Sequence, residues 1–204
     1  MKIVQPSVSL EWITPEPLQA IERAGRVCYK SEDKITADSA ETFCKMIYQR
    51  GHESVMEHAV ASIRIICDRG VSHEIVRHRI ASYSQESTRY CNYSKDKFGN
   101  EITVIEPPDL TDGQRTMWVV GVMGAESAYF SMIENGSTPQ IARSVLPNSL
   151  KTELVMTCNF REWKHFLTLR TSPAAHPQMR QVAMMIKELL SKECPFIFGD
   201  KQNG

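Results

Sequence analysis

The sequence predicts a single α+β domain. Some segments place apolar residues every three or four positions, as amphipathic helices do, while others alternate apolar and polar residues, as half-buried strands do. The 204 residues contain no internal repeat, low-complexity run or linker. A chain of this length can bury a substantial core, so we expect residues 1–204 to form one domain.

The elements of the first half follow from this periodicity. Leu18 and Ile21 recur at helical spacing, and Gly51 is a typical stop after a second helix. Residues 59–67 alternate, and because both faces are fairly apolar we expect a central strand. In order, we predict an extended segment over 1–14, helices over about 16–28 and from Thr36 or Asp38 to Gln49, a strand over 59–67, a turn at 68–70 and a short helix over about 71–79.

The second half contains the longest predicted helix, from Asp112 to Glu134. Its internal Gly121 and Gly124 cost stability unless another backbone packs closely there, which indicates tight helix packing, either within the chain or between subunits. In order, we predict a strand over 101–106, this helix, a short helix over 139–147, a strand over 149–159, a helix capped by Asn159 that reaches Arg170, and a closing helix from Pro177 to about Lys192.

The overall charge excludes a general polyanion-binding surface. Lysine and arginine together number 24, as do aspartate and glutamate, so the formal net charge is zero. Nucleic-acid binding is therefore disfavoured as the main function. The six cysteines form no CxxC pair, and no segment resembles a signal peptide or a membrane span. We expect reduced thiols in a cytoplasmic protein, and no structural zinc site.

Positive charge is instead concentrated in one stretch, residues 77–90. It contains Arg77, His78, Arg79 and Arg89 among several hydroxyl and amide side chains. Guanidinium groups match phosphate bidentately, and hydroxyls and loop amides complete such a shell. The stretch therefore predicts a phosphate-bearing ligand, held where a helix gives way to a loop.

Three further elements carry candidate site residues. The first, Gly51 to His58, reads GHESVMEH, the second is ARSVLP from Ala142, and the third is NFREWKHFLTLR over 159–170. In the first, His52, Glu57 and His58 are side chains of metal-ligand type, but the HExxH spacing of a helical metal site is missing. We expect cofactor contact and helix capping there, and no metal.

The stretch 77–89 resembles the RHRxxSxNxxSxR signature of the flavin-dependent thymidylate synthases. It matches at Arg77, His78, Arg79, Ser82, Ser87 and Arg89, while Ser84 stands for the usual asparagine. The three other elements resemble further motifs of that family in the same order, over roughly residues 50–180. Arg180 also departs from the family, in which a glutamate is more usual at this place.

The resemblance implies a fold and a reaction. The fold is a mixed or antiparallel sheet flanked by helices, the thymidylate synthase-complementing fold. The reaction is the reductive methylation of dUMP to dTMP, with 5,10-methylenetetrahydrofolate as carbon donor, FAD as hydride carrier and NADPH as reductant. It implies a homotetramer with shared active sites, and no covalent nucleophile on the enzyme. Because no GxGxxG follows a strand, FAD would be held by side chains and oligomer contacts.

The resemblance also implies roles for individual residues. Arg170 and Arg77 would be catalytic, Arg143 would reach the phosphate from a neighbouring subunit, His52 would lie on the folate side, and Glu74 would orient an arginine because a carboxylate cannot bind phosphate. The implied dUMP contacts are Glu74, Ile75, Val76, Arg77, Gln85, Glu86, Ser87, Thr88, Arg89, Arg143 and Arg170. The implied FAD contacts are Ser54, Arg77, His78, Arg79, Gln85, Asn159, Phe160, Arg161 and His165.

Two alternative functions remain open from the residues alone. One is a non-enzymatic nucleotide-binding or RNA-binding module built on the arginine stretch, which predicts salt-sensitive binding and a colourless protein. The other is a pyrimidine methyltransferase that uses Cys91 as a nucleophile, because cationic neighbours lower a thiol pKa. A nucleophilic Ser87 is disfavoured, since no Ser-His-acid trio is suggested by the spacing.

Overall fold

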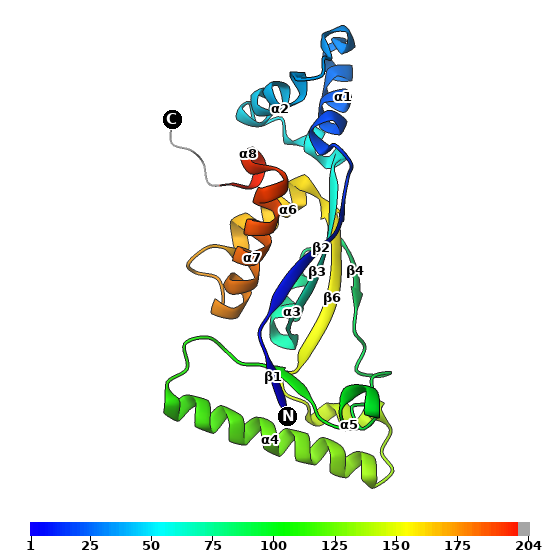
Figure 1. The fold of residues 1–204 in the computed structure, drawn as a ribbon, viewed down its shortest axis with the longest axis vertical. Helices are drawn as coiled ribbons and strands as arrows, with labels where there is room; N and C mark the ends of the chain where they lie inside the picture. Colours follow the sequence, from blue (N-terminus) through cyan, green and yellow to red (C-terminus); the bar gives the residue numbers. More distant parts are fainter. Residues whose placement is uncertain (200–204) are drawn as a thin grey trace. The chain divides into compact units, whose positions relative to one another are not determined.

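The structure, a computed structural model, describes residues 1–199. Helices and strands are mixed along the chain, and the larger sheet has the strand order β2-β3-β6-β4 (Figure 1). This confirms the predicted α+β class. Its strands are β2 (Ser7–Ile13), β3 (Val60–Asp68), β6 (Lys151–Asn159) and β4 (Ser82–Gln85). A second sheet pairs β1 (Lys2–Val4) in parallel with β5 (Thr103–Ile105).

The central strands have the burial that their sequences predict. Every second residue of β6 is buried, from Thr152 to Cys158. On β3, Ala61, Ile63 and Ile65 are fully buried, and the other face is at most half-exposed. A strand covered on both faces can afford few polar side chains, which explains why β3 is the most apolar of the four.

The chain divides into two compact units. The first consists of Met1–Ser7, Ile66–Arg77 and Ser84–Leu154, and the second of Val8–Ile65, His78–Tyr83 and the C-terminal part from Val155. Neither unit is one continuous segment of sequence, since β3, β4 and β6 run from one into the other. That residues 1–204 behave as a single domain stays a prediction.

The first unit contains the long helix α4 (Asp112–Glu134). A capping box between Thr111 and Gln114 begins this helix, and its buried residues are Val122 and Tyr129. Tyr129 belongs to a core that also contains Tyr93, Ile102, Val104, Ala142 and Leu150. The unit also holds α3 (Arg69–Ile75), α5 (Pro139–Ala142) and the 3-10 turns Asp96–Phe98 and Arg143–Val145.

Most of α4 is not covered by the described part of the chain. Met117, Val120 and Met123 are more than half exposed, and a side chain at Gly121 or Gly124 would meet nothing within 4 Å. The tight packing expected around these glycines is therefore absent within residues 1–199. Packing of these glycines against another subunit stays a prediction.

The second unit contains the remaining helices. They are α1 (Pro17–Tyr29), α2 (Ser39–Gln49), α6 (Phe160–Arg170), α7 (Pro177–Glu193) and α8 (Pro195–Phe198), with 3-10 turns at Glu32–Lys34 and Glu53–His58. In Figure 1, α6, α7 and α8 lie together. The indole N–H of Trp163 donates to the carbonyl of Ala61 at 3.1 Å, which ties α6 to β3.

Two local predictions around the arginine stretch were wrong. Residues 68–70 do not form a turn before a helix over 71–79; α3 itself begins at Arg69 because the carboxylate of Asp68 caps it, accepting from the N–H of Val71 at 2.7 Å. The helix then ends at Ile75, so Arg77 and His78 do not continue it. Sequence analysis also missed β4, which lies inside the expected loop.

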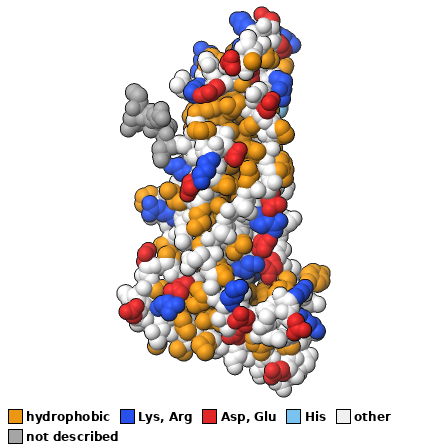
Figure 2. Space-filling model, viewed as in Figure 1, with side chains coloured by type: hydrophobic (Ala, Val, Ile, Leu, Met, Phe, Trp, Pro, Cys, Tyr) orange, Lys and Arg blue, Asp and Glu red, His pale blue; other side chains and the backbone are white. Residues whose placement is uncertain are grey.

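Two surface properties bear on function. On the face shown in Figure 2, lysine and arginine side chains are interspersed with aspartate and glutamate, as the zero net charge suggests. Among the described helices, none combines the length and the apolar character that crossing a lipid bilayer would require.

Candidate active site

The structure divides the expected site residues into two clusters, one in each unit. The first unit contains Glu74, Ile75, Val76, Arg77, Gln85, Glu86, Ser87, Thr88, Arg89 and Arg143. The second unit contains His52, Ser54, His78, Arg79, Asn159, Phe160, Arg161, His165 and Arg170. We call them the arginine-hydroxyl cluster and the imidazole cluster, and each is described by itself.

The arginine-hydroxyl cluster is organised around the loop that follows β4. One terminal nitrogen of Arg143 donates to the hydroxyl of the buried Thr88 at 3.1 Å. The hydroxyl of Ser87 accepts from the backbone N–H of Arg89 at 3.3 Å, and the guanidinium groups of Arg89 and Arg143 are exposed. Arg143 thus already lies beside the motif of its own chain, whereas the sequence resemblance implied a contribution from a neighbouring subunit.

Gln85 and Glu86 hold this loop in place. The amide nitrogen of Gln85 donates to the hydroxyls of Ser72 at 3.0 Å and Thr152 at 3.1 Å. The carboxylate of Glu86 accepts from the ammonium group of Lys151 at 2.9 Å and from the Tyr93 hydroxyl at 3.2 Å. Both side chains are thereby engaged inside the protein.

Two expected ligand contacts cannot be made by side chains. Ile75 and Phe160 are both fully buried, because each occupies the inward face of the first or last turn of its helix. The amide of Phe160 is also used, since it donates to the carbonyl of Ala59 at 2.9 Å. Val76, next to Ile75, is by contrast 36% exposed.

The imidazole cluster is organised by one face of α6. Glu162, Phe166 and Arg170 follow one another at intervals of four residues, so their side chains lie along the same face. His78 packs on this face: its ring centroid is 4.8 Å from that of Phe166 and 5.7 Å from that of His165.

Both ring nitrogens of His78 are engaged by α6. Nδ1 lies 3.1 Å from a carboxylate oxygen of Glu162, and Nε2 lies 3.1 Å from Nε of Arg170. A carboxylate only accepts and a guanidinium only donates. The arrangement that satisfies both bonds is therefore a neutral imidazole with its proton on Nδ1 and its lone pair on Nε2.

The surroundings of His78 favour this neutral form. Burial lowers the pKa of the imidazole, the nearby Arg170 and His165 lower it further, and the hydrogen bond to Glu162 works in the opposite direction without overcoming them. The hydroxyl of Tyr83 donates to the carbonyl of His78 at 2.6 Å and fixes its backbone. Asn159 fixes the N-terminal end of α6, because its side chain accepts from the N–H of Glu162 at 2.9 Å.

A metal ion does not fit this cluster. Among the described residues, His78, Glu162 and His165 form a group with ligand-type atoms within 4.8 Å of one another. Both nitrogens of His78 are already bonded, however, and one of them faces the cation Arg170. A divalent ion would have to displace these bonds beside a fixed positive charge, which is unfavourable.

The outer part of the second unit brings two sequence motifs together. The GHESVMEH element forms the 3-10 turn Glu53–His58, and Glu57 accepts from Arg161 of α6 at 2.6 Å. Glu53 is paired with Lys164 of the same helix. The hydrogen bond to Glu57 raises the pKa of Arg161. Glu57 is therefore an ion-pair partner of Arg161. Within residues 1–199, Glu57, His52 and His58 do not form a group with the spacing of metal ligands.

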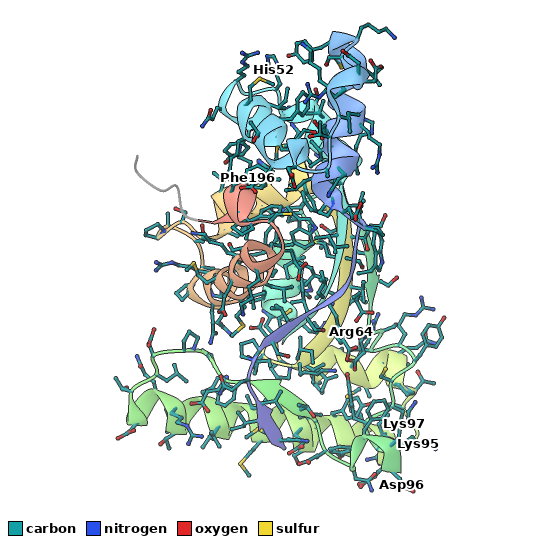
Figure 3. The ribbon with its side chains drawn as sticks, turned by 45° about the horizontal axis from the view of Figure 1, so that its top comes forward. His52, Arg64, Lys95, Asp96, Lys97 and Phe196 are labelled. Atoms are coloured by element: carbon teal, nitrogen blue, oxygen red, sulfur yellow. The ribbon has the colours of Figure 1, made fainter. Side chains whose placement is uncertain are left out.

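Several expected cofactor contacts are exposed near these motifs. Ser54, Arg79 and His165 are exposed, as is His52, whose Nδ1 lies 3.0 Å from the hydroxyl of Tyr29. Figure 3 shows His52 in the region of α1 and α2. Exposed cations and a flat imidazole suit the diphosphate and ring systems of a dinucleotide.

Comparison with known proteins identifies the family. A family model described as thymidylate synthase complementing protein matches residues 9–196. A flavin-dependent thymidylate synthase of Geobacter sulfurreducens is 35% identical over 198 residues, which is 94% of this chain and 84% of the relative. One of Pyrococcus horikoshii is 34% identical over 188 residues, covering 88% of this chain and 76% of the relative.

The chain belongs to the flavin-dependent thymidylate synthase family. The resemblance of the arginine stretch and the prediction of an enzyme are thereby confirmed. A solved structure described as a UMP/dUMP methylase PolB from Streptomyces cacaoi bound with 5-Br dUMP shares the fold, with a TM-score of 0.82 and 24% identity over 97% of this chain and 95% of that chain.

The environment of Cys91 also bears on the alternative built on this thiol. Burial raises the pKa of Cys91, and the neighbouring Glu86 raises it further. A thiol held in its protonated form is a poor nucleophile. Family membership and this pKa shift point in the same direction, away from a cysteine-dependent methyltransferase.

Glu162 is the site residue that sequence analysis missed. A signal was present, because Asn159 followed three residues later by Glu162 resembles the start of a capping box, and the spacing to Arg170 places both on one helix face. What the sequence could not show is that His78 would lie between them.

Proposed function

We propose that this chain methylates dUMP reductively to dTMP, using methylenetetrahydrofolate as carbon donor and NADPH as reductant. FAD, when bound, supplies the hydride. The observation that carries the proposal is the linkage of Arg170 to a neutral His78 within a member of the flavin-dependent thymidylate synthase family. A guanidinium held in one orientation is the group that a developing pyrimidine anion requires.

The uracil ring becomes negatively charged during this reaction. Addition of hydride at C6 spreads charge over C5, O4 and N3, and a cation at the ring edge lowers the energy of that state. We assign this role to Arg170, with Arg77 beside the ring as the resemblance implies. Removing one such donor typically lowers kcat by about 100-fold to 1000-fold.

The phosphate of dUMP is assigned to the arginine-hydroxyl cluster. One nitrogen of Arg143 donates to Thr88, and the rest of its exposed guanidinium group is available to a ligand. Arg89, two residues after Ser87, is also exposed. Guanidinium groups and hydroxyls are typical ligands of a phosphate dianion. The engaged side chains of Gln85 and Glu86 would shape this site through the loop, and Glu74 would orient an arginine.

The FAD contacts are assigned to exposed groups of the second unit. Arg79 and Arg161 would approach the diphosphate, Ser54 would donate a hydrogen bond, and His165 would stack on a flat ring. The side-chain oxygen of Asn159 caps α6, so Asn159 would contact FAD through its side-chain NH2 group. His52 would contact the folate, as the resemblance implies.

The proposal includes a homotetramer with shared active sites. The exposed Met117, Val120 and Met123 of α4, together with the open surface at Gly121 and Gly124, support an interface formed by this helix. Met123→Glu would place a charge in such an interface and is expected to shift the protein to smaller assemblies in sedimentation experiments. An unchanged assembly would count against α4 as the contact surface.

The function is tested by absorbance and by product formation. The purified protein is expected to show the bands of an oxidised flavin, to bleach with NADPH, and to form dTMP only when dUMP and methylenetetrahydrofolate are both present. Arg170→Ala should lower dTMP formation by about 100-fold or more while flavin is retained. Arg23→Ala, an exposed arginine of α1, is the control. A colourless protein that binds RNA would contradict the proposal.

A further inference from the structure

Glu162 is a buried carboxylate to which the chemistry proposed above gives no role. Its side chain is 8% exposed, and the side chain of His78 against it is 4% exposed. A buried carboxylate is costly unless it is paired and hydrogen-bonded. Because His78 is neutral in this arrangement, its ring does not supply the compensating charge. Arg170, on the far side of the ring, supplies a positive charge.

We propose that Glu162 is a positioning residue, which acts through His78 to fix the guanidinium of Arg170. The carboxylate holds the imidazole proton on Nδ1, so that Nε2 is always an acceptor. Nε2 then holds the Nε–H of Arg170 at 3.1 Å and sets the plane of the guanidinium. The inference rests on the proposed function, in which Arg170 stabilises the uracil anion.

The chemistry of the carboxylate is what makes this role specific. A glutamine at position 162 could present either its carbonyl or its NH2 group to Nδ1. In the second case the imidazole proton moves to Nε2, where it faces the Nε–H of Arg170, and two donors oppose each other. Only an acceptor with no N–H excludes that state. Side chains that orient a metal-ligating histidine typically contribute about 10-fold to 100-fold to activity, and we expect an effect of similar size where the oriented group is an arginine.

A purely structural role makes a different prediction. Glu162 lies in the first turn of α6, where a negative charge interacts favourably with the helix dipole. Glu162→Gln removes this charge but keeps the backbone N–H that Asn159 caps. A helix-start role would therefore appear as a small loss of stability, with no effect on the tautomer of His78 or on the pH dependence of catalysis.

The pH dependence of catalysis separates the two roles. The groups around His78 are Glu162, His165 and Arg170 on α6, Tyr83 at its carbonyl, and Cys158, which lies near Glu162 and Tyr83. Burial raises the pKa of Tyr83 and of Cys158, so neither loses its proton near neutral pH. Glu162 raises the pKa of His78. Its removal should therefore move the acid limb of the kcat profile to lower pH.

The experiment compares Glu162→Gln with Glu188→Gln, a control at an exposed glutamate of α7 that is paired with Lys192. In Glu162→Gln we expect kcat to fall about 10-fold to 100-fold, a KM for dUMP changed by less than about 3-fold, and unchanged flavin content. In an Arg170→Ala background the same substitution should have no further effect. A loss of equal size in both backgrounds would overturn the proposal.

A second measurement does not depend on activity. Nitrogen-15 NMR of the flavin-free wild-type protein near neutral pH should show His78 with its proton on Nδ1 and an unprotonated Nε2. In Glu162→Gln the tautomers should mix. A wild-type proton on Nε2 would overturn the positioning role even if the enzyme makes dTMP. Absence of dTMP together with the expected tautomers would instead mean that the proposed function is wrong and that the positioning of Arg170 stands.

Discussion

The two clusters of this chain hold their arginines in different ways. In the arginine-hydroxyl cluster, Arg89 and Arg143 present exposed guanidinium groups, and the neutral hydroxyl of Thr88 holds Arg143. In the imidazole cluster, Arg170 is bonded to a buried ring that is itself bonded to a buried carboxylate. One cluster is a set of available cations, while the other is a connected network.

The difference fits the part of dUMP that we propose each cluster binds: the phosphate for the arginine-hydroxyl cluster and the uracil anion for the imidazole cluster. A phosphate is fully charged before it binds, so exposed cations can bind it and then adjust to it. A uracil anion exists only during the reaction, so the group that stabilises it must already be oriented. The comparison predicts that changes at Glu162, His78 and Arg170 lower kcat, whereas changes at Thr88, Arg89 and Arg143 raise the KM for dUMP.

Among the further changes that test this comparison, removal of His78 is expected to have the largest effect. His78→Ala removes the Nδ1–H that the buried carboxylate of Glu162 accepts from, and it removes the Nε2 acceptor that faces Nε of Arg170. An unsatisfied buried charged group costs about 3 kcal/mol of unfolding free energy, and we expect kcat to fall about 100-fold. Urea unfolding and steady-state kinetics measure both. His73→Ala, at an exposed residue of α3, should change neither, and a KM effect alone at His78 would break the comparison.

Arg143→Ala tests the opposite cluster. Loss of one charge-assisted contact to phosphate should raise the KM for dUMP about 10-fold or more and leave kcat nearly unchanged, because the phosphate charge is the same in the ground and transition states. The preference for dUMP over deoxyuridine should shrink accordingly. Arg115→Ala, in the exposed ion pair with Glu106, is the matched control. A fall in kcat at constant KM would show that Arg143 acts on the reacting ring.

The lowered pKa of His78 predicts a pH dependence of stability. In the unfolded chain the imidazole takes up a proton near pH 6.5, but in the folded protein burial shifts this to lower pH. The unfolded state therefore binds more protons in that window, and the unfolding free energy should fall as pH decreases below about 6.5. His78→Gln should weaken this dependence and His73→Gln should preserve it. Urea titrations at several pH values measure this dependence. An unfolding free energy that does not change with pH in this range would contradict the prediction.

The smallest effect is expected at Thr88. Thr88→Val keeps the shape of this buried side chain but removes the hydroxyl that accepts from Arg143. A typical protein hydrogen bond contributes about 1 kcal/mol net, and Thr88 acts on the phosphate only through Arg143, so the KM for dUMP should rise by roughly 5-fold with kcat unchanged. Thr116→Val, which removes an exposed hydroxyl on α4, should have no effect on KM. An effect at Thr88 larger than that of Arg143→Ala would mean that Thr88 contacts the ligand itself.

The sequence alone determined the family and most of the elements. Strict alternation over 149–159 predicted β6, and α4 begins and ends where Asp112 and Glu134 were expected. These are local properties, since side-chain period and capping residues are set by neighbours along the chain. The same is true of the arginine motif, whose residue order is sufficient to show the resemblance.

Only the tertiary structure decided which site residues act together. The sequence could not show that α3 would stop at Ile75, that β4 would follow, or that Phe160 would point inward. It also could not reveal the link from Glu162 through His78 to Arg170, because 84 residues separate the first pair and 92 the second. Hydrogen bonds over such separations depend on how the chain folds back on itself, and no local pattern records them.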